Sequence, residues 1–254
     1  MRPAQVLVRA PSKLLQPFVK RFLVVEATAA QDDTHLPETG LVAAFQLRGQ
    51  CLLNHDAPAP PASIAGLTEA LRTHKHSAEH AVLIVSFTAV GAAAFLPQPL
   101  HEFSNATVDL HDALSGRAGV RRLHEQMQEA DSATQRVNLV EEFLIGRVGN
   151  ARPDALVAAA VDMIESTHAT LRIGDLARKI GLSQSALERR FRAVVGTSPR
   201  KFSSLVRLQH VSRLVDSGMD LTTVAHASGY TDLSHFINDF KRFTGVAPGS
   251  YFSR

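Results

Sequence analysis

Cysteine and tryptophan are almost missing from this sequence, which has one cysteine, Cys51, and no tryptophan in 254 residues. A single cysteine excludes a disulfide framework, and without a C-x-x-C pair it excludes a zinc site built from cysteines. Such cysteine usage suits a reducing compartment, so we expect a cytoplasmic protein. The absence of tryptophan and the presence of only two tyrosines argue against an aromatic cage for sugars or methylated lysine.

Long apolar runs are also missing. The longest candidate, from Ala81 to Leu96, is interrupted by Ser86, Thr88 and Gly91, whereas a membrane-spanning helix needs about 18 apolar residues. The basic N-terminal residues are followed by no apolar stretch or small-residue cleavage site, so we expect no secretion signal and no membrane partner. With 45% hydrophobic and 20% charged residues, the composition is that of one or two globular domains.

Positive charge is concentrated in the second part of the chain. Residues 1–153 contain 14 Lys and Arg against 15 Asp and Glu, whereas residues 154–254 contain 13 against 9. Between Arg178 and Arg213, nine basic residues accompany a single acid, Glu188. Such a density is either a solvated basic face or a surface for phosphates, and charge alone does not separate the two.

The first 150 residues have the pattern of an α+β domain. The runs 41–47 and 81–87 are short, apolar and rich in branched residues, which predicts strands. Three prolines within 57–62 predict a loop, because proline cannot donate to a strand ladder. Helical periodicity follows over 115–130 and 132–148, and Ser132 with Gln135 forms a capping box at the start of the second helix.

These two helices carry wide apolar stripes, which allow two interpretations. The stripes either pair two subunits in a homodimer or pack on their own domain. If they pair subunits, substitution of Val140 and Leu144 should give monomers. The stripe residues are Val120, Leu123 and Met127 on the first helix and Val137, Val140, Leu144 and Val148 on the second.

An internal repeat occupies the second part of the chain, whose boundary we place between Gly149 and Pro153. Each unit predicts a short helix, a glycine turn, a capping residue and a second helix, which is a helix-turn-helix. The units cover about 173–195 and 221–244, with Ser183 and Thr231 as the expected caps. Ile173, Leu176, Ala177 and Gly181 recur 48 residues later as Leu221, Val224, Ala225 and Gly229; Phe191, Gly196 and Pro199 recur 49 residues later as Phe240, Gly245 and Pro248.

Residues 154–254 resemble the all-α DNA-binding domain of AraC/XylS-type transcription regulators. The resemblance rests on Ile173-Gly-Asp-Leu-Ala, Gly181-Leu-Ser, Leu187-Glu-Arg-Arg-Phe, Gly196-Thr-Ser-Pro, Arg207-Leu, Gly229-Tyr-Thr-Asp-Leu-Ser-His-Phe and Phe240-Lys-Arg-Phe-Thr-Gly-Val-Ala-Pro. It implies two helix-turn-helix units joined by a long helix, here 199–217, and double-stranded DNA as the partner. More weakly, residues 1–150 resemble the sensor halves of such regulators, which implies a small cupin-like β-barrel with a helical pair, a small-molecule effector, a homodimer and, for an activator, contact with RNA polymerase.

The second helix of each unit is expected to enter a major groove, with the apolar stripe turned inward. The outward residues near its start are predicted to contact bases, and the flanking basic residues are predicted to contact phosphates. The predicted base contacts are Gln184, Ser185, Glu188 and Arg189 in the first unit and Ser234, His235 and Asn238 in the second. The predicted phosphate contacts are Arg190, Arg192, Arg200, Lys201, Lys241 and Arg242.

Two other classes of function stay open at this point. One is an enzyme with an attached DNA-binding domain, such as the alkyl-transfer repair proteins, but Cys51 lacks the Pro and His neighbours and the companion cysteines that these need, and the familiar catalytic motifs are missing. The other is a helical bundle that binds proteins. We therefore expect no enzyme activity and no cofactor. The H-x-H spacing of His74 and His76, with His80 nearby, leaves open a metal site, against the alternative of polar histidines in a loop before a strand.

Overall fold

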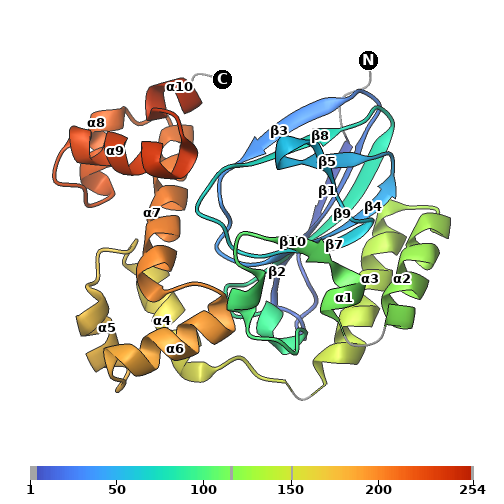
Figure 1. Cartoon of the computed structure of the whole chain (residues 1–254), viewed down its shortest axis with the longest axis horizontal. Coiled ribbons are helices and arrows are strands. Elements are labelled where there is room, and N and C mark those ends of the chain that lie inside the picture. The colour runs from blue at the N-terminus through green and yellow to red at the C-terminus, as the bar shows by residue number, and fades with distance from the viewer. Residues whose placement is uncertain (1–4, 115–116, 150, 253–254) are drawn as a thin grey trace.

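The computed structural model describes residues 5–114, 117–149 and 151–252. It shows a β-rich N-terminal part that carries two long helices on one side and a helical C-terminal part on the other (Figure 1). The sequence-based prediction of an α+β region followed by an all-α region is therefore confirmed. No helix in these ranges combines the length and apolar character needed to cross a membrane.

The larger sheet has six antiparallel strands in the order β1-β2-β9-β4-β7-β10. One of its faces consists of apolar side chains that pack beneath helices, and these include Phe22, Phe45 and Leu83, all 2% exposed or less. The opposite face lines a cavity. The strands are β1 (Gln5–Arg9), β2 (Val19–Ala27), β4 (Val42–Arg48), β7 (Ala62–Ala65), β9 (His80–Phe87) and β10 (Thr107–Asp109).

The smaller sheet has four strands in the order β3-β8-β5-β6 and covers the open face of the larger one. The strands thus form two facing sheets, and the ladders of the described residues do not close into the expected barrel. The predicted loop at 57–62 is corrected too: Pro58 lies in an edge strand, where no N–H is needed, and β7 begins at Ala62. The strands are β3 (Gln31–His35), β5 (Cys51–Leu53), β6 (Ala57–Pro58) and β8 (Arg72–His76).

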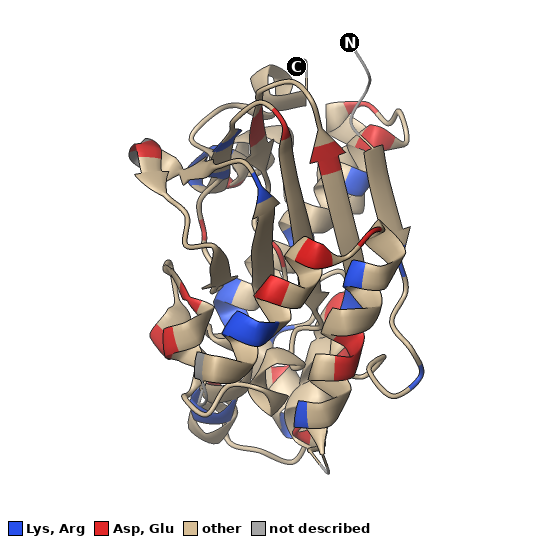
Figure 2. Cartoon of the chain, turned by 90° about the vertical axis from the view of Figure 1, so that its right-hand side faces the viewer, with Lys and Arg blue, Asp and Glu red and all other residues tan. Residues whose placement is uncertain are grey.

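Two helices, α2 (Arg117–Glu129) and α3 (Ala133–Val148), lie on the outer face of the six-stranded sheet. Their stripe residues are buried in the core of this domain; Val140 and Leu144, for example, are 1% and 6% exposed. The interpretation in which the stripes pack on their own domain is therefore the one the structure supports, and substitution of these residues is expected to destabilise the domain. Figure 2 shows charges of both signs interspersed over this side of the molecule.

Short helical segments connect these elements. They are η1 (Asn54–Asp56), η2 (Ala92–Ala94), η3 (Leu100–Phe103) and α1 (Leu110–Ala113). The first two residues of the predicted helix 115–130 lie outside the described ranges.

The C-terminal part contains seven helices within the described residues. Asp154 caps α4 by accepting from the backbone amides of Leu156 and Val157, and Ser183 caps α6 through the amide of Ala186. The predicted cap at Thr231 is wrong, because Asp232 accepts from the amide of His235 and the helix begins one residue later. The helices are α4 (Ala155–Ser166), α5 (Ile173–Lys179), α6 (Gln184–Val195), α7 (Pro199–Asp216), α8 (Leu221–Ala227), α9 (Leu233–Thr244) and α10 (Pro248–Phe252).

Candidate functional site

Helix α6 presents one apolar and one polar face. Leu187, Phe191 and Val195 are fully buried, which leaves Ser185, Glu188 and Arg189 exposed on the other side. The turn before α6 depends on Gly181, whose φ of 72° lies in the left-handed region that favours glycine. Gln184 is exposed as well, but its side chain lies over Gly174 of α5, so it contacts the neighbouring helix.

Helix α9 repeats this arrangement. Phe236, Phe240 and Phe243 are 3% exposed or less, whereas Ser234, His235 and Asn238 lie on the solvent side. The His235 ring contacts Tyr230 edge-on, at 5.3 Å between centroids. Gly229, with φ of 74°, provides the same turn as in the first unit. All seven residues predicted to contact bases are thus exposed on the two second helices.

The six basic residues predicted to contact phosphates differ in their surroundings. Arg200 and Lys241 are exposed. The other four already contact a carboxylate. Arg190 donates to Asp154 through Nε and Nη2, at 3.0 and 2.7 Å. Arg242 lies 2.7 Å from Asp239, Arg192 lies 3.8 Å from Glu188, and Lys201 pairs with Glu69. Arg190 is half-buried and ties α6 to the start of α4, a role that its position on the helix did not reveal.

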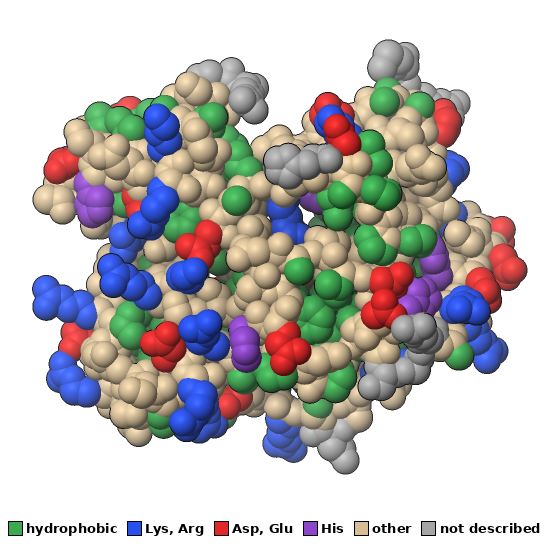
Figure 3. Space-filling model, viewed as in Figure 1, with side chains coloured by type: hydrophobic (Ala, Val, Ile, Leu, Met, Phe, Trp, Pro, Cys, Tyr) green, Lys and Arg blue, Asp and Glu red, His purple; other side chains and the backbone are tan. Residues whose placement is uncertain are grey.

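Helix α7 joins the two units, and its Arg207 contacts residues on both sides of it. Its guanidinium donates to the Ala169 carbonyl after α4, at 2.9 Å, and lies over the Tyr230 ring of the second unit, at 5.2 Å. Tyr230 in turn donates to Asp239 at 3.1 Å. Lys and Arg side chains gather over this helical part on the left of Figure 3.

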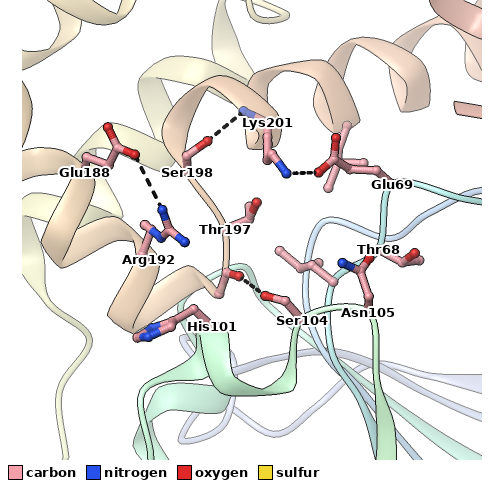
Figure 4. Close-up of a pocket in the computed structure, with 13 residues that line it drawn as sticks. Thr68, Glu69, His101, Ser104, Asn105, Glu188, Arg192, Thr197, Ser198 and Lys201 are labelled. Atoms are coloured by element: carbon pink, nitrogen blue, oxygen red, sulfur yellow. Dashed lines mark hydrogen bonds and ion pairs between the residues drawn. The ribbon is translucent and has the colours of Figure 1, made fainter. Parts of the chain in front are cut away.

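The first unit also contacts the N-terminal part. Ser104 donates to the Gly196 carbonyl at 2.6 Å, and Gln209 of α7 donates to the Pro37 carbonyl at 2.6 Å. A cavity of about 340 Å³ lies at this junction, and Figure 4 shows Lys201 pointing toward Glu69 across it while Glu188 and Arg192 line the α6 side. The N-terminal part therefore lies beside a base-contact candidate and a phosphate-contact candidate of the same unit.

A second cavity, of about 240 Å³, lies between the two sheets. Alternate residues of each strand face it, because side chains alternate across a sheet. On the six-stranded sheet its middle is mainly apolar, with Leu23 and Ile84 paired across β2 and β9, whereas Asp33 and His74 lie midway along the four-stranded sheet. The polar lining residues are Arg21, Asp33, His35, Glu38, Gln46, Cys51, Ser63, Thr68, Arg72, His74, His76, His80, Ser86 and Thr107.

The histidines of this cavity lie on strands, not in a loop, which corrects one of the two interpretations of His74 and His76. The His76 ring stacks on His80, with 4.5 Å between the ring centroids, and the His74 ring lies tilted against His35, with 5.5 Å between the centroids. Burial, with the nearby positive groups, lowers the pKa of His74 to about 4. Across the part of the chain that the structure describes, no group of three or more His, Cys, Asp or Glu side chains could hold a metal ion.

Cys51 behaves as expected for a buried thiol. It is 5% exposed and lines the cavity between the sheets. Burial, and then the nearby Asp33 carboxylate, raise the pKa of the thiol to about 11. A thiol with such a pKa is a poor nucleophile at neutral pH.

Comparisons with known proteins agree with this geometry. A family model described as a helix-turn-helix domain matches residues 176–254, and a model described as a domain of unknown function (DUF6597) matches residues 8–109. The HTH-type transcriptional regulator GlxA of Rhizobium meliloti (strain 1021) is 33% identical over 129 residues, which are 50% of this chain and 38% of that protein. A putative AraC-like transcription regulator of Streptomyces lividans is 33% identical over 100 residues, 39% of this chain and 33% of that protein.

The whole fold also has a solved counterpart. ToxT from Vibrio cholerae matches with a TM-score of 0.50 at 12% identity, over 99% of this chain and 98% of that one. The C-terminal part is thus a double helix-turn-helix domain. Residues 176–254 match the helix-turn-helix model, and this part of the chain is similar to AraC-like regulators, in agreement with the resemblance seen in the sequence motifs. The chain spans only about a third to a half of the curated relatives that it matches.

Proposed function

We propose that this protein is a sequence-specific DNA-binding transcription regulator. The observation that carries the proposal is the pair of helix-turn-helix units, each with an exposed polar face on its second helix. Helix α7 and the contacts of Arg207 connect the two units. We infer that residues 154–254 form the DNA-binding domain and that residues 1–150 form the effector-sensing domain. A role as a cytoplasmic activator that acts as a homodimer and contacts RNA polymerase belongs to the same proposal.

In this proposal α6 and α9 enter successive major grooves on one face of the duplex, about 34 Å apart. Arg189 can pair with guanine and Asn238 with adenine, while Arg200 and Lys241 meet phosphates. The remaining predicted contacts keep their assigned roles. For Arg190 we add a second role: its ion pair with Asp154 positions α6 against the start of α4.

The effector site in this proposal is the cavity between the two sheets. A concave site that combines apolar lining with polar groups is the usual form of a small-molecule site. A ToxT structure carries bound (E)-4-(8-methylnaphthalen-1-yl)but-3-enoic acid, so a protein of this fold accepts a small organic molecule. The relatives RhaS of two Pectobacterium species are named as transcriptional activators, which supports activation over repression.

The test is binding of the purified chain to a randomised duplex library, with repeated selection of the bound fraction. We expect an enriched sequence with two half-sites about one helical turn apart, and affinity that falls steeply with salt because phosphate contacts release counterions. A protein-binding bundle would enrich no sequence and would show no such salt dependence.

A further inference from the structure

The cavity between the sheets has polar groups at both ends; between them the six-stranded sheet presents a mainly apolar wall, and the four-stranded sheet presents Asp33 and His74. The cross-strand register places Arg21, Ser86 and Val42 in one row across β2, β9 and β4, and places Val25, Val82 and Gln46 in another. The two rows are four residues apart along β4, which is about 13 Å at about 3.3 Å per residue. Leu23, Ile84 and Ala44 form the row between them, which continues to Ser63 on β7.

One end of the cavity carries two arginines. Arg72 of β8 donates to the Gly66 carbonyl and, at 3.2 Å, to the Thr107 hydroxyl, both of which are neutral acceptors. Within the described ranges no carboxylate lies at ion-pair distance from Arg72, and burial lowers the pKa of its guanidinium. Arg21 contacts Glu38 at 3.3 Å, but its buried Nε has no hydrogen-bond partner in the structure.

The other end of the cavity carries polar atoms whose hydrogen-bonding capacity is unused. Gln46 Oε1 and His76 Nδ1 are buried and have no hydrogen-bond partner in the structure. Burial lowers the pKa of His76, and Asp33 lies 3.9 Å from its other nitrogen. Because a buried polar atom without a partner is unfavourable, the Gln46 oxygen favours a ligand that donates a hydrogen bond there, and Nδ1 of His76 does so in the tautomer protonated at Nε2.

We infer that the cavity binds a small linear organic acid, with its carboxylate at Arg72 and Arg21, an apolar body along Leu23 and Ile84, and a hydroxyl or ammonium donor at Gln46 and His76. This inference rests on the proposed function, because it names the chemical class of the effector. A carboxylate offers Arg72 the charged acceptor that its present partners do not, and charge-assisted hydrogen bonds are about twice as strong as neutral ones. The row of Leu23, Ile84 and Ala44 gives the apolar body of such a ligand a surface to pack on, whereas Asp33 and His74 face it from the opposite sheet.

The test is calorimetric titration of the full chain with compounds that differ only at their ends. The probes are 6-hydroxyhexanoate, 6-aminohexanoate, hexanoate and 1,6-hexanediol. We expect either bifunctional acid to bind more tightly than hexanoate, and hexanoate more tightly than the diol. The comparison of the hydroxyl and ammonium acids identifies the preferred donor, and 4-hydroxybutanoate and 8-hydroxyoctanoate test the length.

Three variants assign the ends of the cavity. Arg72→Gln should weaken binding of the best acid about tenfold or more, because a hydrogen bond to a charged group contributes about 1.5–3 kcal/mol. Arg72→Lys should retain the preference for the acid over the diol, and Gln46→Leu should remove the preference for the bifunctional acid over hexanoate. Lys75→Gln, on the outward face of β8, is the charge-matched control and should bind as the unmodified chain does.

Three results would overturn the inference: equal binding of the diol and the acids, unchanged binding by an Arg72→Gln variant whose circular dichroism is native, or no binding of any probe by the unmodified chain. DNA selection with the same preparations, without probes, tests the proposed function separately. A chain that selects a DNA sequence but binds none of these acids keeps its proposed function and loses only this effector class.

Discussion

Arg189 and Arg200 are both exposed arginines, but they occupy different places in the helix-turn-helix unit. Arg189 lies in the first half of α6, on the face opposite Leu187 and Phe191, whereas Arg200 lies at the start of α7. Arg189→Ala is expected to cost about 1–3 kcal/mol of specific binding and to relax preference at one base pair. Arg200→Ala should weaken all sequences alike and lower the salt slope by about one.

Competition binding against single-base variants of the selected duplex, at several salt concentrations, measures both effects. Arg121→Ala on α2 is the control, because this exposed arginine lies on the far side of the N-terminal part. If Arg189→Ala leaves base preference intact while its salt slope falls, Arg189 contacts a phosphate and the assignment is wrong.

Asp154 combines a helix cap with an ion pair, and this gives a pH-dependent prediction. Although burial acts to raise the pKa of Asp154, hydrogen bonds from Arg190 and from two backbone amides outweigh it, so the pKa is lowered from its ordinary value of 3.8. A carboxyl with a lowered folded-state pKa contributes stability that is present above its unfolded pKa and is lost as pH falls through the folded one. Asp154→Asn keeps the cap and removes the charge.

We expect Asp154→Asn to lower the free energy of unfolding by about 0.5–1 kcal/mol at neutral pH, because the pair is partly exposed, and the difference should vanish once the pH is below the lowered pKa of Asp154. Urea unfolding at several pH values measures it. Asp162→Asn, an exposed carboxyl on the same helix, should show little difference at any pH. A difference that grows toward acid would contradict the ion-pair account.

Which helix positions are buried and which are exposed could be predicted from the sequence, because a period of 3.6 residues sets them without knowledge of the rest of the fold. The buried positions Leu187 and Phe236 and the exposed positions Arg189 and Asn238 all follow from it. Partners from distant segments did not follow. The contacts of Arg190 with Asp154, of Lys201 with Glu69 and of Arg207 with Ala169 depend on tertiary packing that no local pattern encodes.

At the scale of the element, two glycines make a matched pair. Gly181 has φ of 72° in the turn before α6, and Gly146 lies within α3; a Cβ at either position would meet no atom within 4 Å. Gly181→Ala should therefore lower the free energy of unfolding by about 1–2 kcal/mol through backbone strain alone. Gly146→Ala should raise it by about 0.5–1 kcal/mol, because alanine is the better helix former.

Thermal or urea unfolding of the two variants separates conformation from packing, since neither new methyl group has anything to contact. Equal effects of the same sign would show that the left-handed turn is not required. Gly229→Ala is not an equivalent variant, because its Cβ would lie 3.2 Å from the Thr170 side chain.

The strand elements show where pattern recognition stops. Strands β4 and β9 were predictable as apolar runs, because both faces are largely covered. The four-stranded sheet was not, since β3 (QDDTH) and β8 (RTHKH) contain no apolar residue and face a cavity on one side only. Their pairing is set by the register with each other and with β5, so the histidines that looked like a loop motif line a cavity wall.

At the scale of the whole molecule, the N-terminal part holds the first helix-turn-helix unit through several contacts. Lys201 pairs with Glu69, Gly196 accepts from Ser104, and Gln209 donates to the Pro37 carbonyl. Pro37 lies between Leu36 and Glu38, which line the cavity between the sheets, and Glu38 contacts Arg21. A ligand that competes with Glu38 for Arg21 thus acts one residue away from the contact with α7, the helix that joins the two helix-turn-helix units.

The last prediction concerns Lys201, whose ammonium pairs with Glu69 in the structure but is proposed to contact a DNA phosphate. Glu69→Gln removes the competing charge without changing the shape of the side chain. An exposed ion pair contributes about 0–1 kcal/mol, so we expect DNA affinity to rise by no more than about fivefold at low salt, with the gain lost at high salt. Fluorescence anisotropy titrations over a salt series measure it, and Glu129→Gln, an exposed acid on α2, serves as the control. A gain in both variants would reflect net charge alone, whereas no gain in either would mean that Lys201 does not exchange Glu69 for DNA.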